Sequence, residues 1–311
     1  MRRPKITVIG SSNTDLIATV PRLPSPGETV MGIDFIVAPG GKGANQAVAI
    51  ARIGGDVTFI AKIGIDDNGK RSLENFKKDG INTDFVFQTD EAPSGVALIF
   101  VDKNGENMLV PVPGANGKLT LDDIEKARTA IENTDIIVLQ LEVPLETVEY
   151  AIKIAYKVNV PIVLNPAPGR KLDSDLIKMV TYITPNETEA EILTDIKVTD
   201  DNTAKETGER LLQLGAKTAI ITLGKRGAMV VNKDGNQLVP AFQVDAIDAT
   251  AAGDAFTGGF AFAIATGKDI ISSVKFGNAV AGLTVTKMGA QPSMPKKDEL
   301  EEFLKRAEVN I

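Results

Sequence analysis

Short, almost continuously apolar runs alternate with helix-like stretches along most of this 311-residue chain. The runs read KITVIGS (5–11), VTFIAKIG (57–64), DIIVLQL (135–141), PIVLNPA (161–167), YITPN (182–186) and KTAIITLG (217–224). Such strands are typical of a parallel sheet that helices cover on both faces. Helix-like stretches lie between them at 43–55, 145–159 and 204–215. The alternation predicts right-handed βαβ units and an α/β fold with a doubly wound, mostly parallel central sheet.

Two segments depart from this alternation. Residues 16–39 and 83–102 carry alternating strand-like residues around Pro/Gly turns, which predicts a β-hairpin in each. Three helices are expected to close the chain, near 252–266, 269–286 and 297–307. We therefore expect one domain over residues 1–311, with a small β-sheet lid formed by the two insertions.

Both alternating sets of side chains in the lid segments are apolar. Within 96–101, one set is Val96, Leu98 and Phe100, and the other is Ala97, Ile99 and Val101. A lid that covers a ligand with one face should show polar residues on the other, because large exposed apolar patches are uncommon on monomers. The pattern predicts a homodimer that pairs lid on lid across a two-fold axis. The alternative is that the second face packs on the chain's own main body.

The chain contains neither cysteine nor histidine. Disulfides, thiolate metal sites and cysteine nucleophiles are therefore excluded, and so is the most frequent general base. Acid–base chemistry would fall to Asp, Glu, Lys or Tyr, and any metal would be a hard cation held by oxygen. A net charge of −7 argues against a nucleic-acid surface but not against a small phosphorylated ligand at a helix N-terminus.

The composition is that of an ordinary globular protein, with 43% hydrophobic and 24% charged residues. No apolar run reaches the length of a membrane span. The start, MRRPKITVIG, is basic but leads into a strand-like run without a signal-peptide pattern. We therefore expect a cytoplasmic protein without a membrane partner.

Two common nucleotide-binding signatures are absent from the sequence. There is no G-x-x-x-x-G-K-[ST], and VIGSSNTD stands where G-x-G-x-x-G would follow the first strand. The sequence therefore argues against a P-loop ATPase and an NAD-binding Rossmann protein.

Polar residues follow predicted strands at the edge where ligands bind in open α/β sheets. Asn13 and Asp15 come after the first strand, and Glu142 follows the strand at 135–141. Each could instead be a cap residue or a solvated side chain. At this stage both interpretations stay open.

A glycine-rich stretch, GGKGANQA (40–47), joins a strand-like segment to a helix. Its glycines allow positive φ and a close approach of the backbone to a ligand. Asn45 would point polar groups at that ligand from the first helical turn. The plainer alternative is a tight turn followed by a chance asparagine.

Two later stretches also join strands to turns or helices. NETE (186–189) contains Asn186, which would cap a helix, or would hold a hydrated Mg²⁺ near phosphates together with Glu189. TLGKRG (222–227) could border a nucleotide, or could form a hairpin turn into AMVVNK.

Residues 248–256, DATAAGDAF, place two aspartates around residues with almost no side chain. A strand (QLVPAFQVDAI) is expected to run into a helix here, so that the N–H groups of residues 251–254 are unpaired and form an anion hole. Asp254 could then take a proton from a hydroxyl while these N–H groups stabilise a transferring phosphoryl group. Tight packing explains the small residues but not the aspartate that ends the run.

In this order, GSSNTD, GGKGANQA, PGAN, QLE, NPAP, PNETEA, TLGKRG, DATAAGDAF and KMGAQPSMP resemble the ribokinase family of sugar kinases over nearly the whole chain. The resemblance implies phosphorylation of D-ribose at O5 by ATP with Mg²⁺, with Asp254 as the base and the anion hole at Ala251, Ala252 and Gly253. It implies ribose binding by Asn13, Asp15, Gly41, Lys42, Asn45, Glu142 and Asp254. It implies ATP binding by Asn186, Thr222, Leu223, Gly224, Lys225, Arg226, Gly227, Gly253 and Asn278.

The resemblance further implies activation by K⁺ bound beside the anion hole. Its ligands, several of them through backbone carbonyls, would come from Asp248, Thr250, Thr284, Lys287, Gly289 and Ser293. The sequence departs from the usual D-T-x-G-A-G-D of the family by carrying Ala249 and Ala251. Lys287 stands where arginine is frequent, and Thr284 where a smaller residue is common.

Two other hypotheses remain. One is a sister kinase that acts on fructose, a nucleoside such as adenosine, or a keto-sugar acid, because substrate choice in this fold depends on a few pocket residues. The other is a catalytically silent sugar- or nucleotide-binding regulator, against which the intact Asp254 argues.

Overall fold

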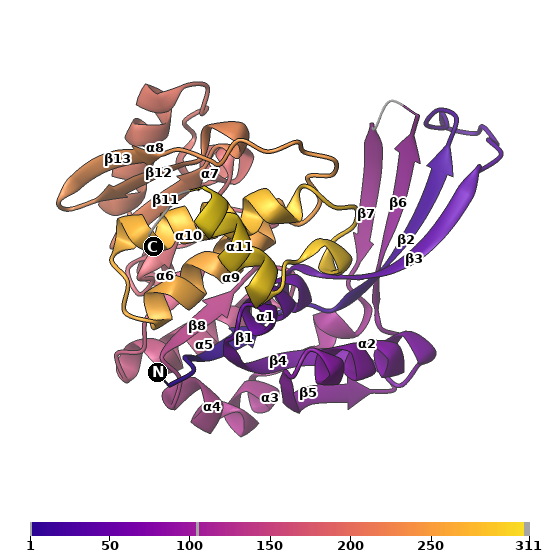
Figure 1. Ribbon diagram of the computed structural model, residues 1–311. Helices are drawn as coiled ribbons and strands as arrows, with labels where there is room; N and C mark the ends of the chain where they lie inside the picture. Colours follow the sequence, from indigo (N-terminus) through magenta and orange to yellow (C-terminus); the bar gives the residue numbers. More distant parts are fainter. Residues whose placement is uncertain (1, 104–105, 308–311) are drawn as a thin grey trace.

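The computed structural model describes residues 2–103 and 106–307, and its main body is built on a nine-stranded sheet (Figure 1). The strand order is β13-β12-β11-β10-β9-β8-β1-β4-β5. Its strands are β1 (Lys5–Ile9), β4 (Asp56–Gly64), β5 (Asn82–Thr89), β8 (Ile136–Leu139), β9 (Ile162–Leu164), β10 (Tyr182–Ile183), β11 (Thr218–Thr222), β12 (Ala228–Asn232) and β13 (Gly235–Val239). All neighbours pair in parallel except β11–β12 and β12–β13, so the predicted mostly parallel sheet is confirmed.

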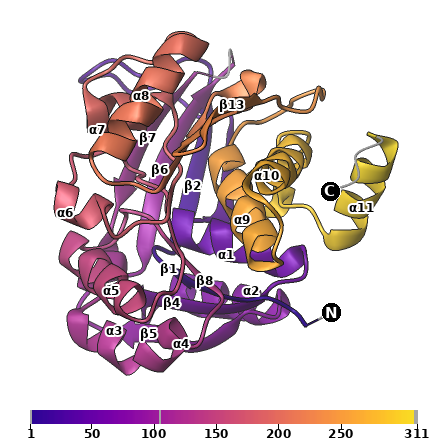
Figure 2. The ribbon, with the colours of Figure 1, turned by 90° about the vertical axis from the view of Figure 1, so that its left-hand side faces the viewer.

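Helices cover both faces of this sheet (Figure 2). On one face lie α1 (Lys42–Arg52), α9 (Ala252–Ala265), α10 (Ile270–Thr284) and α11 (Lys297–Arg306), with α2 (Asp67–Lys78) toward the β5 edge. The other face carries α3 (Leu121–Lys126), α4 (Arg128–Glu132), α5 (Leu145–Lys157), α6 (Ser174–Ile177), α7 (Glu187–Thr194) and α8 (Asp201–Gln213). In the part of the chain that the structure describes, no helix is long and apolar enough to cross a membrane.

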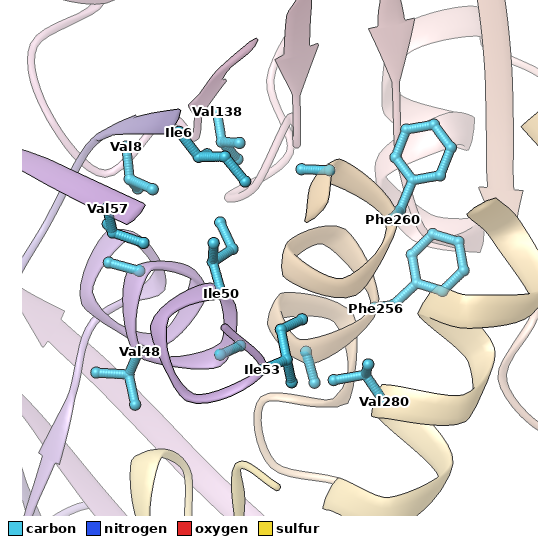
Figure 3. Close-up of a cluster of buried hydrophobic side chains, with 14 of the residues drawn as sticks. Ile6, Val8, Val48, Ile50, Ile53, Val57, Val138, Phe256, Phe260 and Val280 are labelled. Atoms are coloured by element: carbon cyan, nitrogen blue, oxygen red, sulfur yellow. The ribbon is translucent and has the colours of Figure 1, made fainter. Parts of the chain in front are cut away.

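Two hydrophobic cores follow from this layering, one on each face of the sheet. Ile6 and Val8 of β1 belong to the core that also contains residues of α1, α9 and α10, and Figure 3 shows these side chains converging. Ile9 belongs to the opposite core, beneath α5. Because successive strand side chains point to opposite faces, a strand buried on both sides must be apolar nearly throughout.

The strand order reverses direction between β1 and β8. From β1 the chain builds outward through β4 and β5, and it then returns to the other side of β1 to build β8 through β11. In open α/β sheets, ligands bind in the crevice outside the carboxyl ends of the strands at such a reversal. The fold therefore directs attention to the residues that follow β1 and β8.

A second, four-stranded sheet projects from the main body (Figure 1). We call it the lid sheet; its order is β3 (Asp34–Gly40), β2 (Asn13–Val20), β6 (Gly95–Asp102) and β7 (Asn107–Val112). The predicted hairpin at 16–39 is confirmed by the antiparallel β2–β3 pair. The two middle strands, β2 and β6, are parallel.

The second predicted hairpin, at 83–102, is wrong. Its first half is β5, which pairs in parallel with β4 at the edge of the main sheet, while its second half is β6 of the lid sheet. The antiparallel partner of β6 is β7, further along the chain. Phe85 and Phe87 pack against the core of the main body, so their apolar character serves that sheet and not the lid. The Pro/Gly turn between β5 and β6 is thus a crossing between two sheets.

Candidate active site

Polar residues that follow separate strands meet at the edge formed by the carboxyl ends of the parallel strands. Ser11 follows β1, and Glu142 follows β8. Ser11 Oγ donates a hydrogen bond to Glu142 Oε2. The backbone N–H of Lys42, at the start of α1, donates to the same oxygen at 3.1 Å. The expectation that Glu142 lies at a shared edge with the residues after the first strand is therefore confirmed.

The glycines of the turn before α1 serve the chain's own backbone. Gly41 has a φ of 89°, and a Cβ on it would lie 2.6 Å from the backbone nitrogen of Asn13. A Cβ on Gly43 would lie 2.6 Å from that of Ser11. We expected these glycines to let the backbone approach a ligand. The structure shows a packing role for them: they let the start of α1 lie directly on the loop after β1, which brings Asn45 into the site.

Asp254, in the first turn of α9, is buried, with 5% of its surface exposed. Its Oδ2 accepts a hydrogen bond from Asn45 Nδ2 at 2.9 Å, and its Oδ1 accepts one from Gln46 Nε2 at 3.0 Å. Burial raises the pKa of the Asp254 carboxyl, against the opposing effects of the Lys42 charge and the two amide donors. A base with a raised pKa would accept a proton more readily than an exposed aspartate.

Three other carboxylates surround Asp254, namely Asp15, Glu142 and Glu189. Burial, with the charges of Glu142 and Asp254, raises the pKa of Asp15 to about 6. Burial is also the main cause of the raised pKa of Glu189. Burial would lower the pKa of the Lys42 ammonium, but Asp254, Glu142 and Glu189 together raise it, so Lys42 is held as a cation. The site therefore combines several acidic groups with the positive charge of Lys42.

The chain turns sharply before α9. Ala251 has a left-handed backbone (φ 60°), and the helix begins at Ala252. The N–H of Ala252 is engaged by the carbonyl of Ala249 at 3.2 Å. Within residues 2–103 and 106–307, the N–H groups of Ala251, Gly253 and Asp254 have no hydrogen-bond partner. Of the four N–H groups expected to form an anion hole, three are thus available and Ala252 is not.

Two cavities meet at this helix start. The smaller, of about 160 Å³, is lined by Lys42, Glu189, Gly253 and Asp254 together with Asn165, Thr184, Asn186, Thr222, Ala249, Ala251 and Ala252. The larger, of about 770 Å³, shares Gly253 and Asn186 with it and extends over apolar walls that include Phe242, Phe256 and Val285. A Cβ on Gly253 would meet no atom within 4 Å, so this position faces open space.

Most residues expected to border ATP line the larger cavity: Asn186, Thr222, Gly224, Lys225, Gly227, Gly253 and Asn278. Two do not. Leu223 is buried in the core, and Arg226 forms ion pairs with Glu187 and Asp201. The TLGKRG stretch also forms the hairpin turn between β11 and β12, as the second of its two interpretations predicted.

Asn186 and Glu189 form a capping box at the start of α7. Asn186 Oδ1 accepts from the backbone N–H of Glu189, and Glu189 Oε2 accepts from that of Asn186. Glu189 Oε1 also accepts from Asn186 Nδ2. The helix-cap interpretation is therefore correct. Both residues nevertheless line the small cavity.

The segments expected to hold K⁺ come together in part. Asp248 Oδ2 accepts from the Gly289 N–H at 2.8 Å, and Asp248 Oδ1 accepts from Thr250. These bonds outweigh burial and lower the pKa of Asp248. The other side chains of the expected set bond elsewhere: Thr284 to the Val280 carbonyl, Ser293 to the Ala290 carbonyl and Lys287 to Glu299.

Sequence reasoning assigned no role to four buried amides beside the candidate residues. Gln46, Gln140 and Asn165 form a hydrogen-bonded group behind Asp254. Asn116 bonds the backbone of Ser12, and its Nδ2 donates to Asn13 Oδ1 at 2.7 Å. This bond uses the oxygen of the Asn13 amide as its acceptor. The strand-end rule that singled out Glu142 would also have found Asn165, which follows β9.

Comparison with known proteins identifies the class. The model of the pfkB family carbohydrate kinases matches residues 3–297. A Haemophilus influenzae relative named ribokinase is 43% identical, covering 98% of this chain and 100% of the relative. A Salmonella typhi relative named deoxyribokinase is 39% identical, covering 96% of this chain and 98% of its own. The chain therefore belongs to the pfkB family of carbohydrate kinases.

A solved structure leads to the same class. The structure of Arabidopsis thaliana ribokinase complexed with ribose and ATP matches with a TM-score of 0.90 at 30% identity, covering 98% of this chain and 99% of that one. The predicted ribokinase-like fold is thus confirmed.

The raised pKa of Asp15 predicts a pH-dependent stability penalty. Below the unfolded value of 3.8 the carboxyl is protonated in both states, so the penalty is absent; it grows as pH rises through about 6. Asp15→Asn should therefore stabilise the fold at pH 8 by up to about 3 kcal/mol, the equivalent of this shift. Thermal melts should show a gain at pH 8 that vanishes toward pH 4. A gain equal at both pH values would contradict the raised pKa.

Proposed function

We propose that this chain transfers the γ-phosphoryl group of ATP to O5 of D-ribose. The observation that carries the proposal is the buried Asp254 carboxylate beside the unpaired N–H groups of Gly253 and Asp254, in the wall of two joined cavities. The names of the relatives and the ribose and ATP of the matched complex support the substrates.

The candidate sugar ligands are supported by their convergence around Asp254. Asn13 and Asp15 come from β2 of the lid sheet, Asn45 from α1, and Glu142 from the loop after β8. The charge of Asp254 raises the pKa of Asp15, and the charge of Glu142 raises the pKa of both aspartates. These carboxylates and amides would bind the sugar hydroxyls, so the main body and the lid sheet work as one unit.

In the proposed reaction, ATP occupies the larger cavity with its γ-phosphate in the smaller one. Asp254 takes the proton of the sugar O5 hydroxyl as that oxygen attacks phosphorus. The N–H groups at the start of α9 and the Lys42 ammonium stabilise the charge on the phosphoryl oxygens. Lys42 would thereby serve the transferring group as well as the sugar.

Mg²⁺ would be held through water by Asn186 and Glu189. Their fit is supported by their place in the wall of the small cavity, where the Glu189 oxygens keep free lone pairs beyond those used in the capping box. When bound, Mg²⁺ neutralises phosphate charge. Use of ATP agrees with the cytoplasmic location expected from the sequence.

Removal of the base gives the first test of this function. Asp254→Asn should lower kcat with ribose roughly 10²- to 10⁴-fold, the scale for loss of a general base, and leave ATP and ribose binding within a few-fold. The measurement is ATP consumption with ribose, 2-deoxyribose, fructose and adenosine, together with calorimetric binding. Asp269→Asn, at the exposed start of α10, is the matched control.

Two outcomes would contradict parts of the proposal. Near-normal turnover by folded Asp254→Asn would exclude Asp254 as the base. A higher kcat/KM for 2-deoxyribose than for ribose would move the chain to the activity named for its Salmonella relative.

We also propose that K⁺ activates the enzyme at the 248–250 and 284–293 loops. The fit is partial. In the described chain, no N–H donates to the carbonyl oxygens of Thr250, Lys287 and Gly289. Carbonyl oxygens of this kind suit a hard cation. The side-chain hydroxyls of Thr284 and Ser293 are already engaged. We therefore assign the binding oxygens to the backbone and to Asp248.

Exchange of Na⁺ for K⁺ should raise kcat of the wild-type enzyme at constant ionic strength. Asp248→Ala should flatten this response, because it removes a charge and releases the Gly289 loop. Asp245→Ala controls for the loss of a charge. Asp245 lies in the same segment between β13 and α9, but it has no described bond to Gly289. Equal activity of the wild type in the two salts would exclude the cation site.

We propose finally that the lid sheet forms a homodimer. Its register defines two faces: Asp15 shares one with Ala97 and Ile99, and Leu16 shares the other with Val37 and Leu98. We call the second the outer face. It carries seven exposed apolar side chains: Phe35, Val37, Leu98, Phe100, Met108, Val110 and Val112. The alternative of packing on the chain's own main body does not fit their exposure.

A charge on the outer face should separate the dimer. Phe35→Glu, at a side chain with 61% exposure, should shift the mass from two chains to one in light scattering at micromolar concentration and weaken ribose binding. Val158→Glu, at an exposed apolar position after α5, is the control. A wild-type mass of one chain would refute the dimer.

A further inference from the structure

The catalytic candidate Asp254 is held by two side chains that are neighbours in the sequence. Asn45 and Gln46 stand at successive positions of α1, and each donates to a different oxygen of the carboxylate. Both can reach it because α9 packs closely against α1: a Cβ on Gly258 would lie 3.2 Å from the Gln46 carbonyl oxygen. Each oxygen of Asp254 therefore has one N–H donor, and rotation of the carboxylate would break both bonds.

The Gln46 amide is itself fixed from behind. Gln140 Nε2 donates to Gln46 Oε1 at 2.6 Å, and both side chains have no exposed surface. Since Gln46 Oε1 faces a donor, its Nε2 must face Asp254. A flip of the Gln46 amide would place oxygen against the Asp254 carboxylate and nitrogen against nitrogen, so the direction of the chain Gln140 to Gln46 to Asp254 is determined.

Two further contacts keep this chain in place. Gln46 Nε2 also lies 3.2 Å from Asn165 Oδ1, and Asn165 Nδ2 donates to the Thr184 carbonyl at 2.9 Å. Gly10 lies directly beside Gln140, where a Cβ would come within 1.9 Å of Gln140 Oε1. The glycine after β1 therefore makes room for the amide that orients Gln46.

We propose that Gln46, held by Gln140, is a positioning residue that fixes the rotation of the Asp254 carboxylate and keeps it ionised. The inference rests on the proposed role of Asp254 as the base. Neither glutamine lines the small cavity, so both act through Asp254 and not on the phosphate. Loss of the Gln46 donor should therefore affect the chemical step and its pH dependence more than sugar binding.

The charged groups around Asp254 set the sign of the pH effect. Lys42 favours the ionised carboxylate, whereas Glu142, Asp15 and Glu189 oppose it. Removing an N–H donor further disfavours the ionised carboxylate, so the pKa of Asp254 rises. The acid limb of the kcat profile then moves to higher pH. The profile of kcat is the proper measurement because Asp15 also titrates in the free enzyme, whereas kcat reports the enzyme with both substrates bound.

The test uses Gln46→Leu, Gln140→Leu and the double variant, assayed with saturating ATP and ribose between pH 5 and 9. Gln46→Leu should lower kcat roughly 10- to 100-fold, leave the KM for ribose within about threefold and move the acid limb up by about one pH unit or more. Gln140→Leu should act in the same direction but less. Thr207→Val, which removes the hydrogen bond of a fully buried side chain in α8, should change none of these values.

The double variant separates positioning from packing. If Gln140 acts through Gln46, the double variant is no slower than Gln46→Leu, because the second change has nothing left to orient. Independent, multiplicative losses would overturn the proposal, as would an unmoved acid limb in folded Gln46→Leu. If Gln46→Leu does not fold, the Gln140→Leu variant provides the test, and an unmoved acid limb of its kcat profile would overturn the proposal. Wild-type activity with ribose tests the proposed function separately, so the two failures are distinguishable.

Discussion

The parallel pairing of β1 with β8, and of β8 onward through β11, is the constraint on which the candidate site depends. Parallel strands bring all their carboxyl ends to one edge of the sheet, so residues separated by 100 positions or more meet there without any long loop. Glu142 bonds Ser11 and Lys42 across such separations. Burial on both faces makes the strand pairing rigid, which in turn fixes the distances between the polar groups.

The site concentrates like charge at a cost to stability. Four carboxylates, Asp15, Glu142, Glu189 and Asp254, share one buried region with the Lys42 ammonium. The raised pKa values of Asp15 and Asp254 express this cost, because each shift measures how strongly the fold disfavours the ionised group. A polyhydroxylated ligand would offset it by donating hydrogen bonds to these oxygens. The destabilised arrangement is thus suited to binding hydroxyl groups.

The sequence predicts the main fold well because two-sided burial leaves a direct signature, the continuous apolar strand. The 83–102 hairpin fails because alternation identifies a strand but not its sheet, and β5 and β6 alternate equally well. Asp254 can be singled out as a candidate from the sequence because a carboxylate after five small residues is unusual, and the structure places it in the wall of the small cavity. The role of Gln46 cannot be predicted in this way. Its side of α1 faces Asp254 only because α9 packs across α1, and the sequence does not show that packing.

The absence of histidine gives the amide chain behind Asp254 a particular significance. In many enzymes an imidazole orients or relays protons, and its own titration near neutral pH then shapes the activity profile. Here Gln140 and Gln46 supply orientation through groups that do not titrate, so the direction of their hydrogen bonds is independent of pH. Among the described residues, the charges that act on the Asp254 carboxylate come from other carboxylates and from Lys42. The pH response of the site is therefore determined by burial and by mutual repulsion of the carboxylates, with the amides setting the geometry in which that balance acts.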